Sequence, residues 1–103
     1  MRQITIDSIR AFRNGNKFKR GNMEVRVFLD WPTPQTCIKI SQLRLHGNII
    51  ATLSNAGLEI STCGWNTVTT RERLNGLPGV HLIQRNFKLI LNGEPWDGRT
   101  IKI

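Results

Sequence analysis

Short runs of alternating apolar and polar residues, each ended by glycine or asparagine, constrain the fold of this chain most. In residues 23–29 the odd positions are all apolar and the even positions are Glu24, Arg26 and Phe28, so one side faces inward and the other is partly solvated. Such runs alternate with sequences that favour tight turns. The pattern predicts a sheet of antiparallel hairpins in which helix is the minority element. The turn sequences are Asn14-Gly15-Asn16, His46-Gly47-Asn48 and Ser54-Asn55-Ala56-Gly57.

The first of these hairpins is predicted near the N-terminus. Ile4 and Ile6 begin a strand that continues irregularly through Phe12 to the turn at Asn14-Gly15-Asn16. Residues 17–22 return from this turn and lead into the alternating run described above. We therefore expect a basic N-terminal hairpin at about residues 4–29.

One short helix is predicted near residues 69–77. Thr69 and Glu72 have the spacing of a capping box, in which the threonine hydroxyl and the glutamate carboxylate bond each other's amides. Gly76 ends the helix. Leu74 and Leu77 are three residues apart and share its buried side.

Length and composition indicate one folded domain that spans residues 1–103. The chain has 39% hydrophobic and 21% charged residues, which is typical of a folded protein. Its 103 residues are too few to form a second core. The predicted fold class is α+β, mainly β, with a bent antiparallel sheet of about six or seven strands and one short helix. A small β-barrel is the alternative.

Positive charge is concentrated in the first hairpin. The chain has a formal charge of +8, and residues 10–26 hold six basic residues against one acid. A basic hairpin can follow a phosphate backbone, whereas the alternative is a soluble edge strand that prevents aggregation. Two arginines on the predicted helix are additional candidates, with pairing to Glu59 or Asp97 as their alternative role. The predicted sites for nucleic acid or another anion are Arg10, Arg13, Lys17, Lys19, Arg20, Arg26, Arg71 and Arg73.

The aromatic residues have two interpretations each. Phe12 and Phe18 lie among the cations, where they are either stacking platforms for bases or, as we favour, core residues. Trp65 and Trp96 fall at element boundaries, where an indole can close the end of a core. The alternative is that these tryptophans are exposed and anchor a protein–protein interface.

No catalytic, metal or cofactor site is predicted. The cysteines and histidines have no paired spacing that favours zinc, and no phosphate-binding glycine loop is present. The two thiols are expected to be reduced and buried. The cysteines are Cys37 and Cys63, and the histidines are His46 and His81.

The chain is expected in the cytoplasm. Its first residues contain no apolar signal segment, and no run is long and apolar enough to span a membrane.

Three segments resemble a family of small proteins encoded by tailed bacteriophages, and the likeness covers about residues 43–98. It implies a phage product that acts in a bacterial cell, and no functional residues are carried over. The segments are Leu45-His46-Gly47-Asn48, Gly64-Trp65-Asn66-Thr67-Val68-Thr69-Thr70-Arg71-Glu72-Arg73-Leu74-Asn75-Gly76-Leu77 and Leu91-Asn92-Gly93-Glu94-Pro95-Trp96-Asp97-Gly98.

These observations favour a non-enzymatic phage accessory protein that binds nucleic acid through the basic hairpin. One alternative is an inhibitor that binds an acidic host or defence protein. Another is a protein that sequesters a small anionic nucleotide signal between convergent arginines, which requires an oligomer. Exposed edge strands make self-association plausible.

Overall fold

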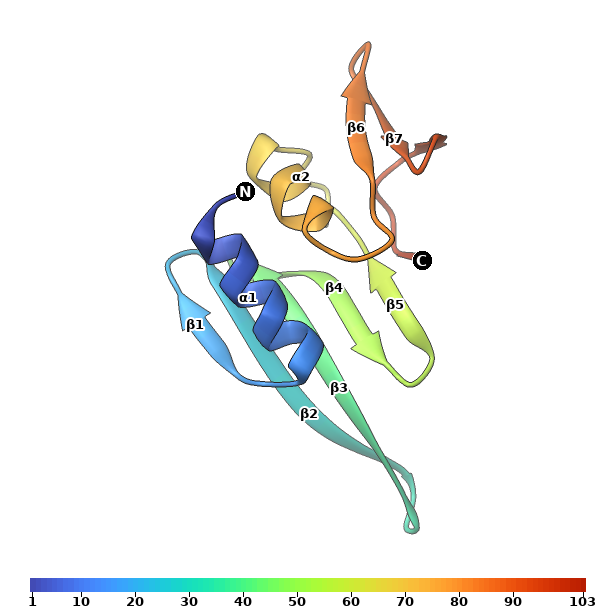
Figure 1. The fold of residues 1–103 in the computed structure, drawn as a ribbon. Helices are drawn as coiled ribbons and strands as arrows, with labels where there is room; N and C mark the ends of the chain where they lie inside the picture. The colour runs from blue at the N-terminus through green and yellow to red at the C-terminus, as the bar shows by residue number, and fades with distance from the viewer.

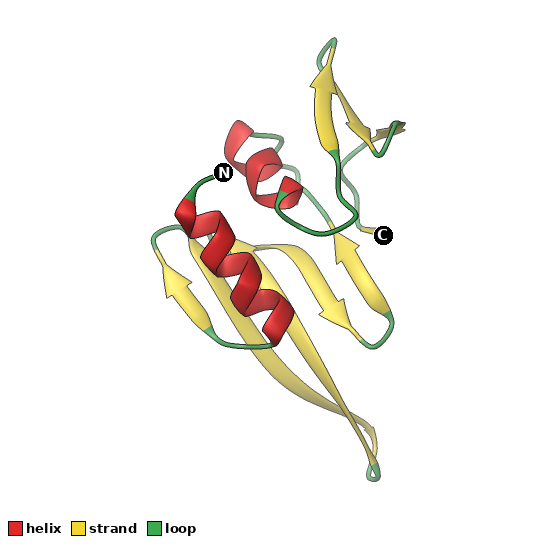
Figure 2. Cartoon of the chain, in the orientation of Figure 1, coloured by secondary structure: helices red, strands yellow, loops and turns green.

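The chain folds into two antiparallel sheets and two helices. A computed structural model describes residues 1–103, and its larger sheet has the strand order β1-β2-β3-β4-β5-β9, while the smaller one has the order β6-β7-β8. The fold class is therefore α+β and mainly β, as predicted, with nine strands and no closed barrel (Figure 2). The elements are α1 (Gln3–Asn14), β1 (Phe18–Arg20), β2 (Met23–Thr33), β3 (Thr36–Leu45), β4 (Asn48–Ser54), β5 (Gly57–Ile60), α2 (Val68–Asn75), β6 (Leu82–Arg85), β7 (Lys88–Leu91), β8 (Glu94–Trp96) and β9 (Ile101–Lys102).

The first element is a helix, so the prediction of a strand from Ile4 to Phe12 is wrong. The buried residues of α1 are Thr5, Ser8, Ile9 and Phe12, whose spacing follows one side of a helix. Gly15 has a φ of 69° and ends α1 as a left-handed cap, so the expected hairpin turn is a helix terminus. The predicted hairpin at residues 4–29 is instead α1 followed by the hairpin β1–β2.

Helix α1 covers only one face of the larger sheet. Odd residues of β2 such as Met23 and Val25 are buried toward α1, and even residues such as Glu24 and Arg26 point to the opposite face. In Figure 1, α1 lies across β1, β2 and β3 on one side of the sheet, and no helix lies on the other. The second face is therefore uncovered.

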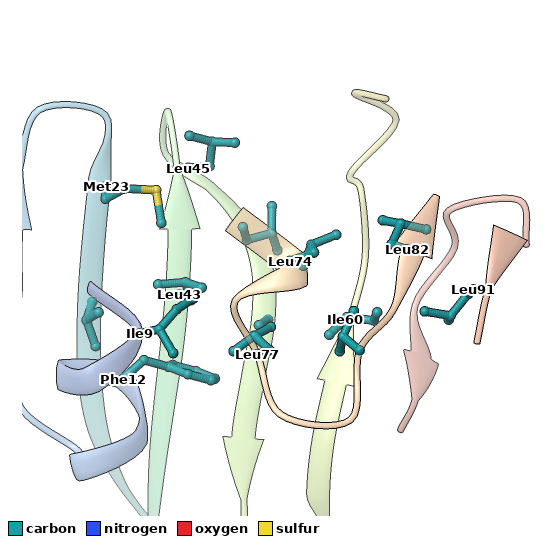
Figure 3. Packing of buried hydrophobic residues seen from close by; sticks show 14 of the residues in the cluster. Ile9, Phe12, Met23, Leu43, Leu45, Ile60, Leu74, Leu77, Leu82 and Leu91 are labelled. Carbon is teal, nitrogen blue, oxygen red and sulfur yellow. The ribbon is translucent and has the colours of Figure 1, made fainter. Parts of the chain in front are cut away.

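Helix α2 completes the core between the two sheets. Leu74 and Leu77 are buried, as predicted, and pack with Ile60 and Leu82 (Figure 3). The helix begins at Val68, close to the predicted position, but its cap is Thr67, whose Oγ1 accepts a hydrogen bond from the Thr70 amide at 3.1 Å. The capping box predicted at Thr69 is thus wrong.

Strands β2 and β3 extend beyond the rest of the molecule as a two-stranded arm, which we define as residues 27–40 (Figure 1). β1 pairs with β2 only as far as Val25, and β4 pairs with β3 only from Ser41 inward. The arm gives the molecule its length of 49 Å against widths of 27 and 20 Å.

Candidate nucleic-acid interface

The predicted anion-binding residues do not form one surface. Arg10 and Arg13 lie exposed on α1. Lys17 and Lys19 are exposed at the edge strand, and Lys19 is paired across the sheet with Glu24 on the uncovered face. The sequence therefore located the cations but did not show that α1 and the sheet separate them.

Arg73 is unavailable to any partner because it is buried in the core of the fold. Its side chain is 1% exposed, and its Nη1 donates to Thr5 Oγ1 at 2.8 Å and to Glu72 Oε1 at 2.7 Å. Thr5 in turn donates to Glu72 Oε2 at 2.6 Å. This buried network ties α1 to α2, so the role predicted for Arg73 in anion binding is not compatible with its position.

Arg71, two residues earlier, is half-buried on α2. Its Nη1 donates to Asn66 Oδ1 at 2.7 Å. Neither helix arginine forms an ion pair with Glu59 or Asp97. Arg73 pairs with Glu72, and Asp97 pairs with Arg99. Arg71 lies on a different element from the basic residues of the sheet and is not brought together with them.

Arg20 is engaged in joining β1 to α1. Its Nη1 donates to Asp7 Oδ2 at 2.7 Å, and its guanidinium lies 5.1 Å from the centre of the Phe18 ring. The hydrogen bond from Arg20, followed by one from Gln3, lowers the pKa of Asp7 below its ordinary value. Arg20 thus has a structural partner that Lys17 and Lys19 lack.

Three cations, Lys19, Arg26 and Arg44, surround Glu24 on the uncovered face of the larger sheet, and Lys17 lines the same groove. Arg26 Nε donates to Glu24 Oε2 at 3.1 Å, and Arg44 lies opposite Glu24 across β2 and β3. The hydrogen bond from Arg26, with the charges of Lys19 and Arg44, lowers the pKa of Glu24. One carboxylate against four cations leaves three positive charges. We call this surface the basic face, made up of Lys19, Arg26 and Arg44 around Glu24 together with Lys17 in the adjoining groove.

Sequence reasoning missed Arg44. Arg44 is two residues after Gln42 on β3, so both side chains lie on the same face, and Arg44 Nη2 donates to Gln42 Oε1 at 2.7 Å. Only the register of β3 against β2 places Arg44 beside Glu24. The Nε of Arg44 is buried and has no hydrogen-bond partner.

An exposed aromatic ring borders the basic face. Phe28 is 43% exposed, and it lines a groove of about 480 Å³ together with Lys17, Lys19 and Arg26. The phenylalanines considered from the sequence are placed differently: Phe12 is buried in the core and Phe18 is half-buried against it. The alternation in residues 23–29 already placed Phe28 on the outer face, so the sequence indicated that this ring is exposed.

The two tryptophans have different environments. Trp96 is half-buried against the core, and its Nε1 donates to the Arg99 carbonyl at 2.9 Å, which agrees with closing the end of a core. Trp65 is 62% exposed and borders a hollow of about 470 Å³ at the start of α2, where Thr67 and His46 also contribute. A core role for Trp65 is therefore wrong.

Both thiols lie at the surface rather than in the core. Cys37 and Cys63 are free and exposed, so the expectation of buried thiols is wrong, and Cys63 Sγ donates to the Ile49 carbonyl at 2.8 Å. No group of three or more histidine, cysteine, aspartate or glutamate side chains is arranged to hold a metal ion. Neither helix has the length and apolar character needed to cross a membrane.

These features define a small α+β protein with a cationic, uncovered sheet face. The chain matches the protein family described as Kyanoviridae Gp96 protein over residues 1–102, and it belongs to this family of cyanophage proteins. No curated protein and no solved structure matches it. The expected phage origin is confirmed, and the family extends over the basic N-terminal segment, which the resemblance at residues 43–98 left out.

Proposed function

We propose that this phage protein is a non-enzymatic accessory protein that binds single-stranded nucleic acid across its basic face, in the cytoplasm of the bacterial host. The observation that carries the proposal is the basic face, in which three cations surround Glu24 and Lys17 lines the adjoining groove, on a sheet face that no helix covers. Phosphate contacts supply most of the affinity in such complexes, and they need clustered, accessible cations.

Phe28 supports a single strand as the ligand. Unpaired bases stack on exposed aromatic rings beside a positively charged groove, and each stacked base contributes about 1–3 kcal/mol. Phe28 lines the same groove as Lys17 and Arg26. An exposed ring suits an unpaired, splayed base better than a duplex, whose bases are already stacked.

The test is a titration of labelled single-stranded DNA, RNA and duplex DNA, followed by fluorescence anisotropy at two salt concentrations. Four phosphate contacts on a single strand predict a loss of affinity of about 50-fold between about 50 and about 200 mM salt, because each contact contributes about 0.7 to the salt slope. Lys17→Glu with Lys19→Glu removes two contacts, so affinity falls by at least about tenfold and the slope by about 1.4. Neither lysine makes a side-chain hydrogen bond or ion pair that the fold would lose.

A matched control changes the same number of charges elsewhere. Arg85 and Lys88 are an exposed, like-charged pair on β6 and β7, so Arg85→Glu with Lys88→Glu alters the net charge equally. Binding in this control is expected to stay within about threefold of wild type, because the basic face is intact. Equal losses in the two double variants, or no binding by wild type at low salt, would show that the basic face is not a nucleic-acid site.

The exposure of Trp65 favours a second candidate function, inhibition of a host or defence protein. Tryptophan is a frequent energetic centre of protein interfaces, and 62% exposure is unusual for so large an apolar side chain. This function predicts that Trp65→Ala abolishes capture of a host protein while Lys17→Glu with Lys19→Glu does not. The same Trp65 variant should leave nucleic-acid binding unchanged.

A further inference from the structure

The arm has two free sheet edges. Beyond Val25 no strand pairs with the outer side of β2, and no strand pairs with the outer side of β3 between Thr36 and Ile40 (Figure 1). A two-stranded ribbon is marginally stable in water, and its unpaired N–H and C=O groups readily pair with another strand. The free edges of the arm are therefore candidates for pairing with another strand.

The arm also exposes large apolar side chains. Leu29 is 63% exposed, Trp31 59% and Phe28 43%, and all three are on β2. Its only charged residues are Asp30 and Lys39, so the arm is neutral in a chain with a formal charge of +8. Repulsion between two copies of the chain is consequently lowest along this segment.

The phase of the backbone hydrogen bonds shows which groups of β2 are free. The His46 amide donates to the Asn22 carbonyl at 2.8 Å, so the backbone groups of even residues in β2 point to β3. Alternation along an antiparallel strand then turns the N–H and C=O groups of Val27 and Leu29 to the free edge. These two residues present a short, regular row of donors and acceptors.

We propose that two copies of this chain form a dimer by pairing the free edges of β2, antiparallel, about a two-fold axis at Phe28. In this register Val27 lies opposite Leu29 of the partner subunit, and the two such pairs exchange about four backbone hydrogen bonds. Phe28 lies opposite Phe28 of the partner subunit, which places two aromatic rings side by side on the outer face.

Charge complementarity selects this register. Centred on Phe28, the pairing sets Arg26 opposite Asp30 of the partner subunit, and the symmetry repeats the ion pair. Centred on Leu29, it would set Arg26 opposite Pro32 of the partner subunit and lose both ion pairs. The regular ladder of β2 ends at Asp30, where its register with β3 shifts, so the proposed pairing uses only the regular part of the strand.

Sedimentation equilibrium of the full chain tests the dimer, with the mass of the wild type expected to approach twice 11.8 kDa as concentration rises. Arg26→Asp and Asp30→Arg each place like charges opposite one another, so each variant should be monomeric at the concentration where wild type is dimeric. The double variant R26D/D30R exchanges the charges and should restore the dimer. All of these side chains are exposed, and circular dichroism checks that each variant is folded.

A proline variant tests the backbone pairing independently of charge. Leu29→Pro removes an N–H that the β3 ladder does not use, so the variant should keep its fold and lose the dimer. Leu29→Thr keeps the N–H and should remain dimeric. The proposal is overturned by a monomeric wild type, by single charge variants that stay dimeric, by a double variant that stays monomeric, or by a dimer that survives Leu29→Pro.

Discussion

At the scale of single residues, the turn between β6 and β7 holds an aromatic side chain in a backbone conformation that favours glycine. Asn86 and Phe87 have φ values of 51° and 66°, and the flanking pair Arg85 and Lys88 closes a two-residue hairpin. Asparagine followed by glycine is the preferred sequence for such a turn. Phe87 is also 94% exposed, so its ring gains nothing from burial to offset the strain.

Phe87→Gly is therefore expected to stabilise the protein. Relief of the left-handed strain should raise the free energy of unfolding by about 1 kcal/mol, measured by urea denaturation. Phe87→Ala is the matched control, because it removes the ring and keeps the Cβ atom that causes the strain, and it should show no such gain. A glycine variant no more stable than the alanine variant would contradict the strain argument.

At the scale of elements, α1 is attached to the sheet through polar contacts as well as through Ile9 and Phe12. The ion pair of Asp7 with Arg20 joins α1 to β1, and the network around Arg73 joins α1 to α2. The hydrogen bonds to Asp7 from Arg20 and Gln3 lower its pKa from an ordinary value of 3.8. Because the pKa of Asp7 is lower in the folded state, the contact stabilises the fold fully above the ordinary pKa of 3.8. This stabilisation is lost as pH falls through the lower, folded pKa.

Asp7→Asn is expected to lower the melting temperature at neutral pH and to make no difference in acid. The wild type loses the same contact as pH falls below 3.8 and then through the lower pKa that Asp7 has in the folded state, so the two melting temperatures should converge only below that folded pKa. Arg20→Gln should have a similar effect at neutral pH, and the double variant should lose little more than either single variant. Additive losses, or a gap that does not narrow as pH falls below 3.8, would argue against the ion pair.

Alternation predicted the elements whose buried sides are apolar, and it failed at α1. β2 and the inner half of β3 follow the odd and even positions of the sequence, and α2 follows from Leu74 and Leu77, whereas β4 buries the consecutive residues Ile50 and Ala51 beside a register shift. In α1, two of the four buried residues are Thr5 and Ser8, which interrupt the apolar stripe that identifies an amphipathic helix. Their burial depends on partners such as Glu72, which are distant in sequence.

The candidate site was predictable in part for the same reason. Lys17, Lys19 and Arg26 were identified because clustered charge is visible in the sequence. Arg73 could not be told from Arg71, because only contact with Thr5 and Glu72 makes it a buried residue. Arg44 joins the basic face through strand register, which depends on the position of β3 beside β2.

At the scale of the whole molecule, the proposed dimer turns two separate sheets into one. Residues opposite each other across paired strands point to the same face, so the two basic faces would share one side of a continuous sheet. They would lie on either side of the paired Phe28 rings. A nucleic-acid strand long enough to reach both would bind two sites at once, and the second contact would be intramolecular.

Length dependence of binding is therefore expected in the wild type. An oligonucleotide that spans both basic faces should bind at least about a hundredfold more tightly than one that covers a single face, because the second contact occurs at high effective concentration. Anisotropy titrations with a series of increasing lengths measure this gain. Leu29→Pro should bind the short oligonucleotides at least as tightly as wild type, because Arg26 no longer faces Asp30 of the partner subunit, and it should lose the gain with length because it does not dimerise. A gain with length that persists in this variant would mean that the second contact lies within one chain.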